Sequence, residues 1–154
     1  MSEWKRSTKE VSWEDLLPEM VSAIKQHIGQ YNLGPILSDA LMGIQTDSEK
    51  IKKGLFGGSE KVTMGAVVTP RWLVWSVLEE GKKATALSAQ LINITVQDYV
   101  QTPFAQMVPD SGIQVSGIFT DAIEPASAFI GLDQSPAAER FREVIIQATQ
   151  DAKK

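Results

Sequence analysis

Residues 61–78 have the sequence KVTMGAVVTPRWLVWSVL, and this stretch decides the fold class. Apolar side chains occupy every second position from Val62 to Val68, which is the period of a β-strand with one buried face. After Thr69-Pro70 comes a run rich in β-branched and aromatic residues, which are typical of strands. The two halves therefore predict a β-hairpin.

The chain after this hairpin predicts more strands and one helix. The expected strands cover residues 84–92 (with a short bend), 93–100, 113–119 and 126–132. Ser135 has the position of an N-cap, and Pro136 occupies the first helical position, where its missing N–H costs nothing. Short strands followed by one amphipathic helix predict a strongly bent antiparallel sheet, or partly open barrel, whose open end the helix covers.

The first part of the chain predicts helices. Residues 1–12 are polar and are expected to be frayed, whereas apolar spacing of three and four predicts a helix from near Pro18 to near Gly29. A second, shorter helix is expected over residues 36–44. The predicted class is α+β, with residues 1–58 as an N-terminal helical extension packed on the sheet and residues 59–154 as the β-domain.

Two stretches resemble the bacterial pleckstrin-homology-like domain. Residues 67–75, VVTPRWLVW, are similar to a hairpin of that family, and residues 129–141 resemble its last strand and the start of its C-terminal helix, where Phe141 would plug the barrel. The resemblance covers about residues 60–150 and implies a binding fold. Lipid-binding members carry several Lys and Arg around a long first loop, whereas here that connection is only Thr69-Pro70.

Composition restricts the classes of function. The net charge of −4 gives no global attraction for nucleic acid, so no nucleic-acid partner is expected. The sequence has no Cys, which excludes disulfides and thiolate chemistry. The first residues open no apolar run of the secretory type, and no stretch approaches the roughly 20 apolar residues of a membrane span. We therefore expect a cytoplasmic protein.

The residue types of common catalytic sites are sparse. His27 is the only histidine, and a nucleophilic triad would require a Ser and a carboxylate to converge on it. One His without any Cys would leave a zinc ion only carboxylates. We therefore expect no catalytic residues, no metal site and no cofactor.

Two groups of residues are candidates for binding. Phe104, Met107 and Val108 lie between two prolines in an unusually long connection, residues 101–112, and large apolar groups on a loop often mark a contact surface. The alternative interpretation is that this loop folds back and closes the barrel. The second group consists of four cations that would contact an anion or a lipid surface: Lys61, Arg71, Lys82 and Lys83.

The sequence thus favours a binding module that is not an enzyme. Protein–protein contact, including contact with a second copy of the chain, is the leading interpretation. Peripheral binding to a membrane or phospholipid is the alternative, disfavoured by the acidic charge balance. A third interpretation is a small-ligand carrier or an enzyme that uses the barrel interior as its pocket.

Overall fold

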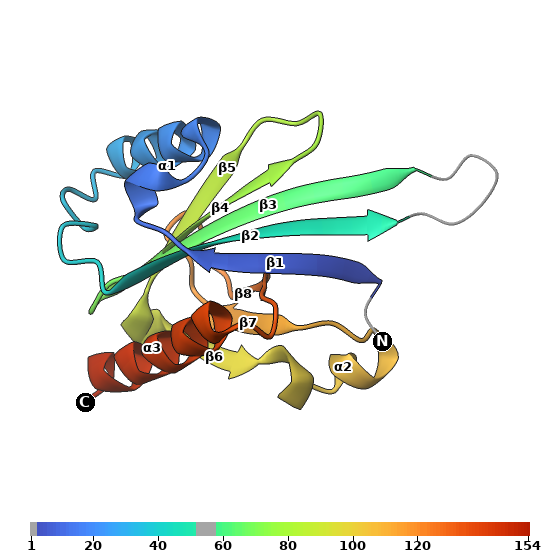
Figure 1. Ribbon diagram of the computed structural model, residues 1–154. Coiled ribbons are helices and arrows are strands. Elements are labelled where there is room, and N and C mark those ends of the chain that lie inside the picture. The colour runs from blue at the N-terminus through green and yellow to red at the C-terminus, as the bar shows by residue number, and fades with distance from the viewer. Residues whose placement is uncertain (1–2, 52–57) are drawn as a thin grey trace.

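The computed structural model of the protein describes residues 3–51 and 58–154. Within them, the chain forms two antiparallel sheets and three α-helices (Figure 1). The first sheet has the strand order β1 (Trp4–Glu10), β2 (Met42–Ile51), β3 (Ser59–Val68), β4 (Trp72–Glu79) and β5 (Thr85–Gln90). The second contains β6 (Ile94–Asp98), β7 (Gly112–Gly117) and β8 (Ala126–Gly131). The helices are α1 (Pro18–Gln30), α2 (Phe104–Met107) and α3 (Pro136–Ala152), and short 3₁₀ turns are η1 (Trp13–Asp15), η2 (Leu91–Asn93) and η3 (Tyr99–Gln101).

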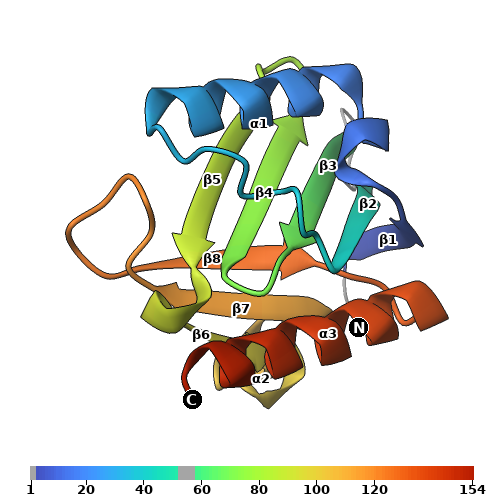
Figure 2. The same cartoon turned by 90° about the vertical axis from the view of Figure 1, so that its left-hand side faces the viewer.

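The first sheet is covered on both faces. Figure 2 shows α1 across one face and the second sheet against the other, with the strands of the two sheets crossing. α3 contacts β1 and β2 of the first sheet and β6 of the second. The C-terminal helix therefore closes one side of the space between the sheets.

The main core fills the space enclosed by the two sheets and α3. Trp75 of β4 is fully buried there, and its ring meets that of Phe119 edge-on with 5.1 Å between centroids. Phe141 of α3 is also fully buried in this core. Large aromatic side chains in such positions supply much of the apolar area that folding buries.

A second core lies between the first sheet and α1. Val74 of β4 faces this core, whereas its neighbours Leu73 and Trp75 face the main core. The second core also contains Leu16, Met20 and Ile24. Because β4 is buried on both faces, its sequence is an apolar run interrupted by Ser76 rather than an alternating pattern.

The predicted arrangement is wrong in three respects. The expected helix over residues 36–44 is a loop followed by β2, so only one long helix precedes the hairpin of β3 and β4. The single bent sheet or partly open barrel is instead two sheets, of five and three strands, among the described residues. Residues 4–10, expected to be frayed, form β1 at the edge of the first sheet.

β1 and β2 were not predicted because polar residues occupy several of their buried positions. The hydroxyls of Thr8 and Thr46 share a hydrogen bond of 2.8 Å in the interior. Nη1 of Arg6 donates to Oγ of Ser48 at 2.6 Å, and the Arg6 guanidinium also holds the carboxylate of Asp110 at 2.6 and 3.0 Å. Polar side chains thus occupy positions where the expected pattern requires apolar ones.

Other predictions are confirmed. β3 and β4 form the expected hairpin with Thr69-Pro70 in its turn, and α1 begins at Pro18 as expected. α3 has Ser135 as its N-cap, with Oγ accepting from the backbone N–H of Ala138 at 3.3 Å, and Pro136 as its first residue. The division into residues 1–58 and 59–154 stays a prediction.

Candidate functional site

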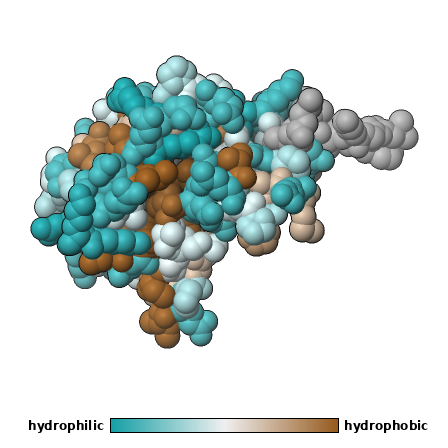
Figure 3. All heavy atoms as spheres, turned by 90° about the horizontal axis from the view of Figure 1, so that it is seen from below, coloured by the Kyte–Doolittle hydropathy of each residue, from teal (hydrophilic) through white to brown (hydrophobic). Residues whose placement is uncertain are grey.

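Apolar side chains are exposed around α2. We call Val100, Phe104, Met107 and Val108 the α2 patch. The exposed fraction is 59% for Phe104, 83% for Met107 and 64% for Val108. Figure 3 shows the molecule from below, with pale brown and brown spheres at the right, where Figure 1 places α2. The structure thus brings the three predicted contact residues together on the surface, and they do not fold back over the core.

The backbone beneath the α2 patch is held in place. The hydroxyl of Tyr99 donates to the carbonyl of Val108 at 2.6 Å, and that of Thr102 donates to the carbonyl of Tyr99 at 2.7 Å. Tyr99 and Thr102 are buried, and the Tyr99 ring packs edge-on against Phe129 with 5.0 Å between centroids. The patch is therefore presented by a fixed loop, which lowers the entropy that binding would cost.

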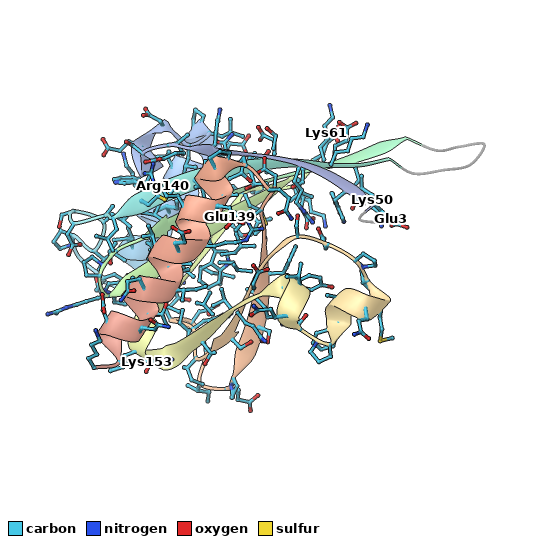
Figure 4. All side chains as sticks on the ribbon, turned by 60° about the horizontal axis from the view of Figure 1, so that its bottom comes forward. Glu3, Lys50, Lys61, Glu139, Arg140 and Lys153 are labelled. Atoms are coloured by element: carbon cyan, nitrogen blue, oxygen red, sulfur yellow. The ribbon has the colours of Figure 1, made fainter. Side chains whose placement is uncertain are left out.

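The four predicted cations do not gather in one place. Lys61, labelled in Figure 4, lies on β3 close to the turn between β4 and β5, which carries Lys82 and Lys83. Arg71 lies at the opposite end of β3 and β4, in the turn that joins them. Lys82 is paired with Glu79 at 2.7 Å, and this hydrogen bond raises the pKa of Lys82.

A cleft opens beside Arg71, at the end of the first sheet. Its volume is about 630 Å³, and it lies among the loop before β2, the β3–β4 turn, η2 and the end of α3. We call it the end groove, defined by Leu41, Arg71, Trp72, Gln90, Ile92 and Ala148. Figure 2 shows these segments meeting on the side that faces the viewer.

The end groove continues in two directions. Leu41 and Ala148 also line a hollow that follows α3 past Val144. Trp72 and Gln90 also line a hollow that reaches the connection between β7 and β8. The three hollows thus share lining residues and are neighbours at this end of the molecule.

Hydrogen bonds fix the walls of the end groove. The buried hydroxyl of Thr69 accepts from the backbone N–H of Arg71 at 3.2 Å and from that of Trp72 at 2.9 Å. The N–H of Leu41 donates to the carbonyl of Val68 at 2.8 Å, and the N–H of Leu91 donates to the carbonyl of Arg71 at 2.8 Å. The groove is therefore preformed rather than dependent on a loop closing.

The two charged side chains at the end groove, Asp151 and Arg71, differ in their partners. Asp151 lies 3.1 Å from Nζ of Lys154 and accepts from Nε2 of Gln147 at 3.0 Å; these two contacts lower the pKa of Asp151. Arg71 is exposed, and its guanidinium has no ion pair with any residue of 3–51 or 58–154. The guanidinium of Arg71 is therefore available to a ligand.

His27 lies in a largely buried polar cluster with Ser88 and Thr120. Its Nε2 is 2.7 Å from Oγ of Ser88, which in turn is 2.6 Å from Oγ1 of Thr120. Burial lowers the pKa of His27, and the nearby charge of Asp121 partly offsets this effect. The pair of His27 and Ser88 resembles part of a nucleophilic triad, but Ser88 is fully buried and leaves a substrate no access to its hydroxyl. The cluster ties α1 to β5 and to the connection between β7 and β8.

The described residues contain neither a group of metal-binding side chains nor a membrane-spanning helix. Across residues 3–51 and 58–154, no three His, Asp or Glu side chains are grouped in a way that could hold a metal ion. Of the helices in the described chain, none has the length and apolar character needed to cross a bilayer.

Sequence reasoning found the α2 patch and missed most of the end groove. Leu41 was expected on a helix, and Ile92 and Ala148 had no predicted role in binding. Arg71 was predicted as an anion contact. Trp75 is buried in the main core, whereas Trp72 is partly exposed. The groove is assembled from distant segments, so no local motif marks it.

Comparison of the chain with models of known families, with curated proteins and with solved structures finds no match. The resemblance to pleckstrin-homology-like domains stays a prediction.

Proposed function

We propose that the protein is a non-catalytic binding module that pairs with a second copy of itself through the α2 patch. The observation that carries this proposal is the exposure of Phe104, Met107 and Val108 on a loop whose backbone is fixed by Tyr99 and Thr102. A few side chains near the centre of an interface commonly supply most of its binding energy.

The sequence of the patch favours a second copy as the partner. Residues 99–109, YVQTPFAQMVP, contain no charged side chain. A two-fold axis places the same surface of both copies face to face, so any charge near the axis would approach its own like charge. An uncharged patch avoids this repulsion even though each copy carries a net charge of −4.

Sedimentation equilibrium over a range from about 1 μM to about 1 mM tests the pairing, since a dissociation constant of 1 mM corresponds to only about 4 kcal/mol. We expect a reversible dimer whose dissociation constant rises at least about tenfold in the double variant Phe104→Ser/Met107→Ser. Circular dichroism should show that this variant remains folded, because both side chains are exposed.

Ile123→Ser is the matched control. Ile123 is the most exposed large apolar residue described, at 97%, and lies in the connection between β7 and β8 rather than in the α2 patch. This variant should dimerise like the wild type. A chain that stays monomeric throughout the range, or one that Ile123→Ser disrupts equally, would show that the α2 patch does not pair.

A further inference from the structure

We propose that the end groove binds an extended peptide segment of a partner protein in which apolar side chains flank an acidic one. The end groove lies at the opposite end of the first sheet from Lys82 and Lys83. Binding there does not depend on pairing through the α2 patch.

The shape of the groove argues for a peptide rather than a small molecule. Pockets for small ligands are clefts or cavities deep enough to bury most of the ligand surface. Here Leu41 and Ile92 are 52% and 58% exposed, so the walls are shallow. Neighbouring hollows also lie on two sides of the groove, along α3 and toward the β7–β8 connection. An extended chain that runs along the groove can place successive side chains in these neighbouring hollows.

The lining of the groove argues for apolar side chains on that peptide. Leu41, Trp72 and Ile92 form its exposed apolar walls, and Ala148 on α3 leaves room between them because its side chain is small. A partly exposed Trp held by fixed backbone is a frequent anchor for a partner. Gln90 at the same edge offers an amide that can hydrogen-bond to a peptide backbone.

The charge of the groove argues for an acidic side chain. The carboxylate of Asp151 is already occupied by Lys154 and Gln147, whereas Arg71 keeps its guanidinium beside Trp72 and Pro70. A guanidinium can hold a carboxylate through two parallel hydrogen bonds. Thr69 fixes the backbone of the turn that carries Arg71, so this side chain starts from a defined position beside the apolar walls.

Selection of a displayed random peptide library on the intact protein tests this proposal. We expect enrichment of peptides with Asp or Glu between apolar residues, and binding of a selected synthetic peptide should change the emission of the protein. Trp72→Phe should remove that change. Enrichment of no peptides, or of peptides without an acidic residue, would overturn the proposal.

Charge reversal provides the decisive variant. Arg71→Glu should lower the affinity for the selected peptide by about fivefold or more. Replacing the acidic residue of the peptide by Lys should restore binding to this variant. Lys83→Glu changes the net charge equally but lies at the other end of the sheet, so it should leave the affinity unchanged. Ile92→Ser should weaken binding by about tenfold, because it removes an apolar wall. Equal weakening by Arg71→Glu and Lys83→Glu would reveal a non-specific charge effect and refute the site.

Discussion

At the residue scale, His27 links the stability of the fold to pH. The imidazole is 6% exposed and is hydrogen-bonded to Ser88, and burial disfavours its charged form. The pKa of His27 is therefore below 6.5, its ordinary value, in the folded chain. Asp121 acts in the opposite direction, but burial has the larger effect.

We predict that the free energy of unfolding falls as the pH is lowered below 6.5. In that range the unfolded chain binds a proton at His27 and the folded chain does not, so protonation favours unfolding. Above 6.5 the stabilisation is fully present, and below the folded pKa the decline attributable to His27 stops. Urea denaturation at a series of pH values between about 8 and 5 measures how the free energy of unfolding changes with pH. Because a single proton is involved, this slope is at most about 1.4 kcal/mol per pH unit.

The variant His27→Gln tests the assignment, because the chain contains only one His. The variant should lose the slope between pH 6.5 and 5 while keeping an amide that can bond to Ser88. Asp133 and Asp151 titrate outside this window, since both have a pKa below 3.8 in the folded protein. An unchanged slope in the variant would assign the pH dependence to other groups.

At the scale of elements, the first sheet depends on a close approach of backbones beside β2. A Cβ on Gly43 would lie 2.5 Å from the carbonyl oxygen of Val11, and the N–H of Val11 donates to the carbonyl of Gly43 at 3.0 Å. A Cβ on Gly29, near the end of α1, would have no heavy atom of another part of the chain within 4 Å. The two glycines therefore have opposite roles.

We predict that Gly43→Ala lowers the free energy of unfolding by about 1–3 kcal/mol, because backbone atoms must move apart to admit the methyl group. Gly29→Ala should instead raise it by about 0.5–1 kcal/mol, since Ala favours the helical conformation. Urea denaturation of both variants at neutral pH measures these changes. A neutral Gly43→Ala variant would mean that the approach of Val11 is easily relaxed.

Elements with regular apolar spacing were predictable from the sequence, and those with polar interiors were not. The alternation in residues 61–68 predicted β3, and Ser135-Pro136 predicted the start of α3. β2 was mistaken for part of a helix because Thr46 and Ser48 occupy buried positions beyond Ile44. Their partners, Thr8 and Arg6, come from a strand about 40 residues earlier in the sequence, so the pairing that satisfies them is not visible locally.

At the scale of the whole molecule, the candidate surfaces differ in how far the sequence could predict them. The α2 patch comes from one stretch, so its composition alone marked it. The end groove combines the loop before β2, the β3–β4 turn, η2 and α3, and depends on how the two sheets and α3 pack. The four predicted cations were grouped by residue type, and the fold separates Arg71 from the other three.

This separation leads to a last prediction, about membranes. A cation near an anionic bilayer contributes about 1 kcal/mol only when it lies close to the surface, and several must do so together. Lys82 is paired with Glu79, and Glu60 also lies near enough to affect it. With a net charge of −4, the chain as a whole is repelled by anionic lipid.

We therefore expect co-sedimentation with anionic vesicles to be no greater than with neutral ones, even at low salt where charge attraction is strongest. The double variant Lys82→Glu/Lys83→Glu should behave like the wild type, because we expect no charge-dependent vesicle binding in either protein. Salt-sensitive binding to anionic vesicles that this variant abolishes would instead identify the β4–β5 turn as a membrane contact. It would also place that contact at the opposite end of the first sheet from the end groove, so that a membrane-bound molecule would still have Arg71 and Trp72 free for a partner.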